Sequence, residues 1–99
     1  AGTLSLDPER GIVTADGRRI DLPPKEFALL RVLMERRNRV LTRDELLNLA
    51  WGWDFDGTDR VIDGHIKKLR RALGPHADCI KTVVKRGYKL EVDGDESKT

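Results

Sequence analysis

The chain has 99 residues, of which 36% are charged, and a formal net charge of +2, a size that suits one domain with a modest core. No apolar run approaches the roughly 18 residues of a membrane span, no signal peptide opens the chain, and the lone Cys79 excludes an internal disulfide and suits a reducing cytoplasm. The first residue is Ala1, not an initiator Met, which indicates an excised domain or a processed product.

Residues 3–22 predict a small antiparallel sheet. TLSLD alternates apolar and polar residues, DPERG is a turn, and GIVTAD is followed by RRIDL. Asp16-Gly17 joins the last two stretches and is typical of a hairpin turn. Pro23 ends the sheet, and Pro24 suits the first turn of a helix, where its missing N–H costs nothing.

Two helices are expected next. Residues 25–37, KEFALLRVLMERR, spread apolar side chains over an arc of roughly 160°, which predicts a helix packed by neighbours on several sides. RVLT predicts a short strand, and Thr42 with Glu45 fits a capping box that opens a helix over residues 43–50. The aromatic and acidic loop WGWDFDGTD follows.

The third predicted helix is RVIDGHIKKLRRAL, residues 60–73, which Gly74-Pro75 stops. On a helical wheel a narrow apolar stripe faces the core: Ile62, Ile66, Leu69 and Leu73. Three cations lie opposite this stripe: Arg60, Lys67 and Arg71. His65 and Lys68 take one flank and Asp63 and Arg70 the other, where Asp63 is placed to orient Lys67 and Arg70.

A basic β-hairpin is expected after this helix. IKTVV and YKLEV flank the three-residue connection Lys85-Arg86-Gly87. Residues 60–90 hold nine Lys/Arg against two Asp/Glu, a net charge of +7, whereas residues 1–59 carry −2 and residues 91–99 carry −3. Charge alone leaves open a solvated basic face or a surface for a polyanion.

The order of strands, three helices and hairpin predicts an α+β fold. This is a winged helix-turn-helix domain over residues 1–92, with an N-terminal antiparallel sheet, three helices and a C-terminal β-hairpin wing, followed by an acidic, disordered tail over residues 93–99. In that fold the third helix can enter the DNA major groove, about 12 Å wide, while the wing reaches the backbone or the minor groove. Cations on both elements favour DNA as the partner.

Four blocks of the sequence also resemble a known family. LPPKEFALLRVL, VLTRDELLNLAWG, DRVIDGHIKKLRRAL and TVVKRGYKL occur in the order and spacing of the OmpR/PhoB family, the C-terminal DNA-binding domains of two-component response regulators, from about Leu4 to Val92. The resemblance implies sequence-specific binding to double-stranded DNA as a cytoplasmic output domain in transcription regulation. It further implies a receiver domain on the N-terminal side, a sensor histidine kinase acting through that receiver, homodimers on tandem direct-repeat half-sites, and contact with RNA polymerase.

The resemblance also implies roles for single residues. Lys68 and Arg70 match positions that read base edges. Contacts with the DNA backbone fall on seven residues, of which Arg71 is placed there by the wheel: Trp51, Arg60, His65, Lys67, Arg71, Thr82 and Tyr88. His65 is expected to be exposed on its helix flank, as a donor to a phosphate. The loop residues that match the polymerase contact are Trp53, Asp54, Phe55 and Asp56, although one aromatic could instead fold back onto the core.

Four positions depart from the family pattern. Pro23 stands where Ser or Thr is usual, so the first helix loses its side-chain cap. In the wing Val84 replaces the usual Arg or Trp and Lys85 replaces a Gly, so Lys85 and Arg86 are left to supply a basic backbone contact. Gly64, where a larger residue is common, costs about 1 kcal/mol relative to Ala, which is either tolerated or justified by close approach of another surface.

Other chemistry finds little support in the sequence. DFDGTD has its glycine at the wrong position for a calcium loop, and the possible metal ligands His76, Asp78 and Cys79 share one short loop without a distant partner. No phosphate-binding loop or nucleophile elbow occurs, so neither a cofactor, a metal nor an enzyme is predicted. The alternative to DNA binding is a winged helix that docks a protein, RNA polymerase or another acidic partner, but the wheel offers no exposed apolar patch for it.

Overall fold

The computed structural model of the chain describes residues 4–52 and 60–91, with the backbone alone at Arg60. Its elements are β1 (Leu4–Asp7), β2 (Ile12–Ala15), β3 (Arg18–Ile20), α1 (Pro24–Glu35), α2 (Arg43–Trp51), α3 (Arg60–Leu73), η1 (Gly74–Cys79), β4 (Ile80–Val83) and β5 (Gly87–Leu90). The predicted order of elements and the predicted bounds of α3 are confirmed. The first helix ends two residues earlier than predicted, and the second ends one residue later. The predicted tail, residues 93–99, lies outside the described residues.

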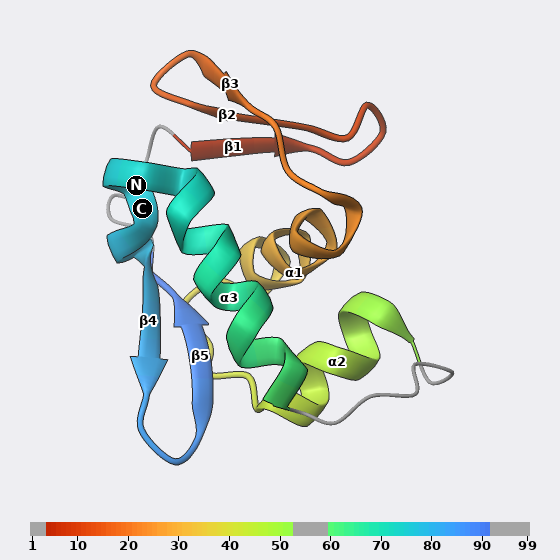
Figure 1. Cartoon of the computed structure of the whole chain (residues 1–99), viewed down its shortest axis with the longest axis vertical. Coiled ribbons are helices and arrows are strands. Elements are labelled where there is room, and N and C mark those ends of the chain that lie inside the picture. The colour runs from red at the N-terminus through yellow and green to blue at the C-terminus, as the bar shows by residue number, and fades with distance from the viewer. Residues whose placement is uncertain (1–3, 53–59, 92–99) are drawn as a thin grey trace.

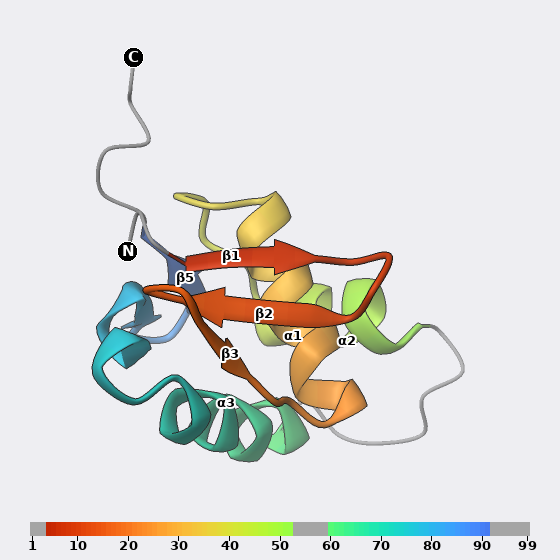
Figure 2. The same cartoon turned by 90° about the horizontal axis from the view of Figure 1, so that it is seen from above.

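The two sheets lie at different ends of the helical core (Figure 1). The antiparallel sheet β1-β2-β3 covers one end of the helices, and the hairpin β4-β5 runs alongside α3 at the other. Seen from above, β1 and β2 lie over α1, while α3 runs along one side of the molecule (Figure 2). One flank of α3 therefore meets the hairpin, and the helix keeps a face that no other element of the described chain covers.

The core is built from the apolar faces that the sequence predicts. On α3 the four residues of the predicted stripe are at most 2% exposed: Ile62, Ile66, Leu69 and Leu73. On α1 Leu29, Leu30 and Leu33 are fully buried. Burying such a side chain contributes about 1.5–3 kcal/mol, so the stripe anchors α3 firmly and fixes which of its faces points outward.

Local signals set the element ends. Thr42 opens α2 with the predicted capping box, in which its Oγ1 accepts from the Glu45 N–H at 3.0 Å and its own N–H donates to the Glu45 carboxylate at 2.9 Å. Pro23 precedes α1 without a side-chain cap, as expected. Asp16 and Gly17 both have positive φ, 55° and 80°, the backbone that a tight hairpin turn requires.

The connection of the wing differs from the prediction by one residue. Gly87 pairs with Val83 inside the hairpin, so the loop is residues 84–86, and Lys85 takes the left-handed conformation at φ 65°. The reason for the glycine is a close approach of backbone: a Cβ on Gly87 would lie 1.9 Å from the Leu41 carbonyl oxygen. The short strand predicted at RVLT is reduced to one antiparallel bridge, Leu41 to Tyr88.

Candidate nucleic-acid interface

The face of α3 that points away from the core carries exposed cations, as the wheel predicts. Lys67, Lys68 and Arg71 are exposed on the helix, and Lys85 and Arg86 are exposed at the wing tip. The side chain of Arg60 lies outside the described residues. A cationic surface shared by a helix and a hairpin can hold two adjacent stretches of a polyanion.

Arg70 lies where α3 meets the wing. Its Nη2 donates to the Ile80 carbonyl and to the Thr82 hydroxyl, both at 2.8 Å, and its guanidinium carbon is 5.7 Å from the centre of the Tyr88 ring. The structure thus brings the predicted base reader together with two predicted wing contacts. Because both hydrogen bonds use Nη2, the N–H groups of Nε and Nη1 are the donors that base reading would require.

Tyr88 is a packing residue of the wing more than a surface one. Its side chain is buried, and its hydroxyl donates to the Asp63 carboxylate at 2.5 Å. The same carboxylate oxygen accepts from Nε of Arg43 at 2.9 Å, which joins the start of α2 to α3 and β5. Burial and the bond to Asp63 raise the pKa of Tyr88. Asp63, expected to orient Lys67 and Arg70, therefore contacts Arg43 and Tyr88 in the structure.

His65 was expected to be an exposed hydrogen-bond donor, and the structure corrects this expectation. Its side chain is only 20% exposed, and Nδ1 contacts the carboxylate of Glu26, which is 3% exposed. The Trp51 ring meets the imidazole edge to face, with centroids 4.9 Å apart. The wheel placed His65 on a flank correctly, but α1 and the end of α2 pack against that flank. Whether the remaining edge meets a phosphate stays a prediction.

Glu26 is a residue that the sequence reasoning passed over. The signal was present, because Leu29, Leu30 and Leu33 follow Glu26 at three, four and seven residues, which puts the carboxylate on the core face of α1. A charge at such a position needs a partner inside the fold.

Trp51, the last residue of α2, holds the start of α1. Its Nε1–H donates to the Lys25 carbonyl at 3.2 Å, and Nζ of Lys25 lies 4.9 Å from the ring centre. Trp51 is half-buried, so only part of the ring can face a ligand. The ring also packs against His65, and the predicted contact of Trp51 with the DNA backbone stays a prediction.

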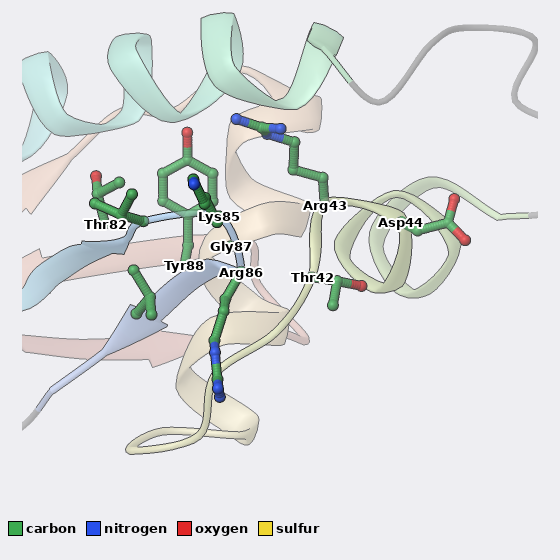
Figure 3. A pocket seen from close by; sticks show the side chains of 10 residues that line it. Thr42, Arg43, Asp44, Thr82, Lys85, Arg86, Gly87 and Tyr88 are labelled. Atoms are coloured by element: carbon green, nitrogen blue, oxygen red, sulfur yellow. The ribbon is translucent and has the colours of Figure 1, made fainter.

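A cleft of about 480 Å³ separates the start of α2 from the wing. It is lined by Thr42, Arg43, Asp44 and residues 82–88, and Figure 3 shows Arg43 pointing toward α3 and Arg86 pointing away from it. Arg43 was not predicted as a site residue. The sequence signal is a cation in the first turn of a helix, where the helix dipole disfavours positive charge.

The remaining residues that the sequence analysis singled out either have a structural role or lie outside the described residues. A Cβ at Gly64 would meet open space, so packing within the described residues does not require the glycine. His76 contacts Asp16 at 2.9 Å and joins η1 to the β2-β3 turn. The predicted polymerase loop, Trp53, Asp54, Phe55 and Asp56, lies outside the described residues. None of the helices described is long and apolar enough to cross a membrane.

Comparison with known proteins agrees with this geometry. Residues 17–90 match the family model "Transcriptional regulatory protein, C terminal". The chain is 43% identical over 94 residues to the sensory transduction protein RegX3 of Mycobacterium leprae, and 40% identical over 90 residues to the response regulator protein PmrA of Pseudomonas aeruginosa. These matches cover 92% and 91% of the chain but 48% and 40% of the relatives, so the chain spans less than half of their length.

Solved structures give the same result. The DNA-binding domain of CpxR from E. coli matches with a TM-score of 0.78 at 33% identity, over 92% of each chain. DrrB of Thermotoga maritima, an OmpR/PhoB homologue, matches with a TM-score of 0.80 at 35% identity, over 92% of this chain and 42% of DrrB. The matched family consists of transcriptional regulatory proteins. The winged-helix fold, the cationic α3 and wing, and these matches together show that the chain belongs to the OmpR/PhoB family of response-regulator DNA-binding effector domains.

Proposed function

We propose that the chain binds double-stranded DNA with sequence specificity, with α3 in the major groove and the wing on the neighbouring backbone. The observation that carries this proposal is the position of the cations. Lys67, Lys68 and Arg71 are exposed on α3, and the hydrogen bond from Arg70 to Thr82 keeps the wing beside them. The major groove of B-DNA is wide enough to admit an α-helix such as α3.

We assign the roles of single side chains from the family positions that they match, and their exposure supports the assignment. Lys68 and the free donors of Arg70 read base edges, while Lys67 and Arg71, with Arg60, bind phosphates. Thr82 is exposed and accepts from Arg70, so its own hydroxyl hydrogen can go to a phosphate. Lys85 and Arg86 contact the backbone from the wing tip.

Three further residues contribute to this surface by packing or by a partly exposed group. Tyr88 acts by fixing the wing, and His65 offers its exposed edge beside Trp51. Arg43 adds a cation on the opposite wall of the cleft.

The relatives suggest the wider setting. Since they are more than twice as long as the matched segment, we infer a receiver domain on the N-terminal side, controlled by a sensor histidine kinase. Homodimers would then occupy tandem direct repeats in the cytoplasm, and the segment 53–56 would meet RNA polymerase. A related DNA-binding domain, that of AdeR, has been crystallised with an intercistronic region; at 24% identity it supports the fold alone.

The test is fluorescence anisotropy of this chain with a random-sequence duplex pool at several salt concentrations, with enrichment of the bound fraction. We expect affinity to fall steeply with salt, as for about 4–8 displaced phosphates, and a tandem motif to emerge. A shallow salt slope without any enriched motif would contradict DNA binding and support the alternative, a winged helix that docks an acidic protein.

A further inference from the structure

Glu26 is the one charged residue in the buried set of the described chain, and it lies outside the cationic face. Its carboxylate sits in the first turn of α1 and contacts Nδ1 of His65 on α3. A buried carboxylate is costly unless it is paired and hydrogen-bonded. His65 is the partner that satisfies it, so α1 and α3 are joined through a charged contact directly beneath the proposed DNA surface.

The contact determines what the other ring nitrogen can do. An ionised carboxylate only accepts hydrogen bonds, so Nδ1 must carry a hydrogen. In the neutral ring Nε2 is then a bare acceptor, which a phosphate oxygen cannot bind. In the imidazolium both nitrogens donate, and the buried charge of Glu26 is then neutralised within the chain. The imidazolium form of His65 therefore both pairs with the buried Glu26 carboxylate through Nδ1 and keeps a hydrogen on Nε2 to donate to an outside ligand.

The surroundings hold the ring in one orientation. The Trp51 ring meets the imidazole at an interplanar angle of 76°, and Trp51 is itself fixed by its bond to the Lys25 carbonyl. Among the described residues, Glu26 of α1 contacts the imidazole, and Nζ of Lys25 lies over the ring of the uncharged Trp51 beside it. Lys68 follows one turn further along α3. With Nδ1 bound to the interior, the exposed fifth of His65 is left for an outside ligand.

We propose that Glu26 is a positioning residue for DNA binding: it fixes Nδ1 of His65, so that the protonated ring presents Nε2–H to a backbone phosphate. This inference rests on the proposed function. It assigns a binding role to a buried carboxylate, and it makes part of the affinity depend on whether both nitrogens of the His65 ring carry a hydrogen.

The test compares the wild-type chain with Glu26→Gln, at fixed salt and with the random-sequence duplex pool, at about pH 6 and about pH 8.5, on either side of the usual histidine titration. We expect Glu26→Gln to bind about five- to tenfold more weakly near pH 6 and nearly as well as wild type near pH 8.5, because a neutral ring with its hydrogen on Nδ1 has none on Nε2 to donate to a phosphate. Asp16→Asn is the matched control, because it removes the carboxylate of the other histidine pair, at His76, and should change neither value.

A purely structural role would weaken binding equally at both pH values, and that result would overturn the inference. His65→Gln provides a second test: combined with Glu26→Gln it should lose no more affinity than His65→Gln alone, and additive losses would also overturn the inference. If the glutamine variants do not fold, the ring ¹⁵N shifts of the wild-type chain on DNA decide: Nε2 should be protonated near pH 6, and a bare Nε2 contradicts the proposal. Failure of the proposed function is distinguishable, because wild type would then show no salt-dependent binding at all.

Discussion

Arg70 on α3 and Thr82 on β4 are joined by a hydrogen bond of 2.8 Å, and the same nitrogen of Arg70 reaches the Ile80 carbonyl. One side chain of the proposed recognition helix therefore fixes the start of the wing. On the other side of the hairpin, the Tyr88 hydroxyl fixes β5 to Asp63. Helix and wing are thus tied at two points, and a change at either point alters how the two cationic surfaces are presented together.

Arg70→Ala should have two effects that can be separated. Loss of base reading should cost about 1–3 kcal/mol on the selected site and relax preference at one base. Loss of the contacts with Ile80 and Thr82 should also loosen the wing, which should weaken binding to random-sequence duplexes. Fluorescence anisotropy with the selected duplex and with a random-sequence duplex measures the two effects.

Thr82→Val is the matched control for this experiment. It removes the acceptor on β4 but leaves the guanidinium, so it should weaken both duplexes slightly without changing base preference. If Arg70→Ala weakened binding to the selected and random duplexes equally, the assignment of base reading to Arg70 would be wrong. Its role would then be to hold the wing against α3.

Lys67→Ala should weaken binding to all sequences alike. Lys67 is exposed on the face opposite the core, where a single phosphate contact is expected. Removing it should reduce the slope of log affinity against log salt by about 1. Arg10→Ala in the β1-β2 turn removes another exposed cation far from α3 and should leave the slope unchanged. An equal effect of the two variants would indicate that only net charge matters.

Ile66→Asp should unfold the chain, because it places an unpaired charge in the anchoring stripe, where Ile66 is 1% exposed. The neighbouring Lys67→Asp changes a charge on the opposite face, so this variant should remain folded but lose affinity for DNA. Thermal unfolding followed by circular dichroism distinguishes the two. A stable Ile66→Asp variant would mean that α3 is rotated from the orientation described.

Lys85→Gly should stabilise the fold and weaken DNA binding. Lys85 takes φ 65°, a conformation that costs a non-glycine residue about 1–2 kcal/mol, so glycine should raise the free energy of unfolding by about 1 kcal/mol. The lost cation should reduce the salt slope. Denaturant titration measures the first effect and anisotropy the second. Unchanged affinity would show that the wing tip carries no phosphate contact.

The sequence predicted the secondary structure and the outward face of α3 well, because those follow from local periodicity. Ile62 and Ile66 mark the core side, and the capping box at Thr42 marks the start of α2; both signals act within one or two turns of helix. Where the structure differs, the cause lies in a distant segment. Gly87 was expected in a turn, but the backbone of Leu41, far away in sequence, requires it in the strand.

In the candidate site, too, local periodicity predicts some features and contacts between distant segments determine the others. The exposure of Lys67 was predictable from the wheel, whereas the partial burial of His65 involves a contact with Glu26, 39 residues earlier in the chain. Tyr88 and Asp63 are likewise brought together by the fold, and nothing in their separate neighbourhoods predicts the bond. Long-range polar pairs are therefore the part of this site that only the structure supplies.

Tyr88→Phe should remove part of the alkaline sensitivity of the fold. The pKa of Tyr88 is raised by burial, then by its bond to Asp63, so the native state holds the proton more tightly than the unfolded state. The stability that this provides is present below the usual tyrosine value of about 10 and is lost as pH rises through the higher native value.

Denaturant titrations of wild type and Tyr88→Phe from about pH 8 to about pH 11.5 check this prediction. Near pH 8 the variant should be less stable by about 1 kcal/mol, from the lost hydrogen bond. The difference should narrow above about pH 10. The raised pKa of buried Cys79 acts in the same direction in both proteins and cancels in the comparison. A constant difference across the range would show that the Tyr88 hydroxyl is not held by Asp63 in solution.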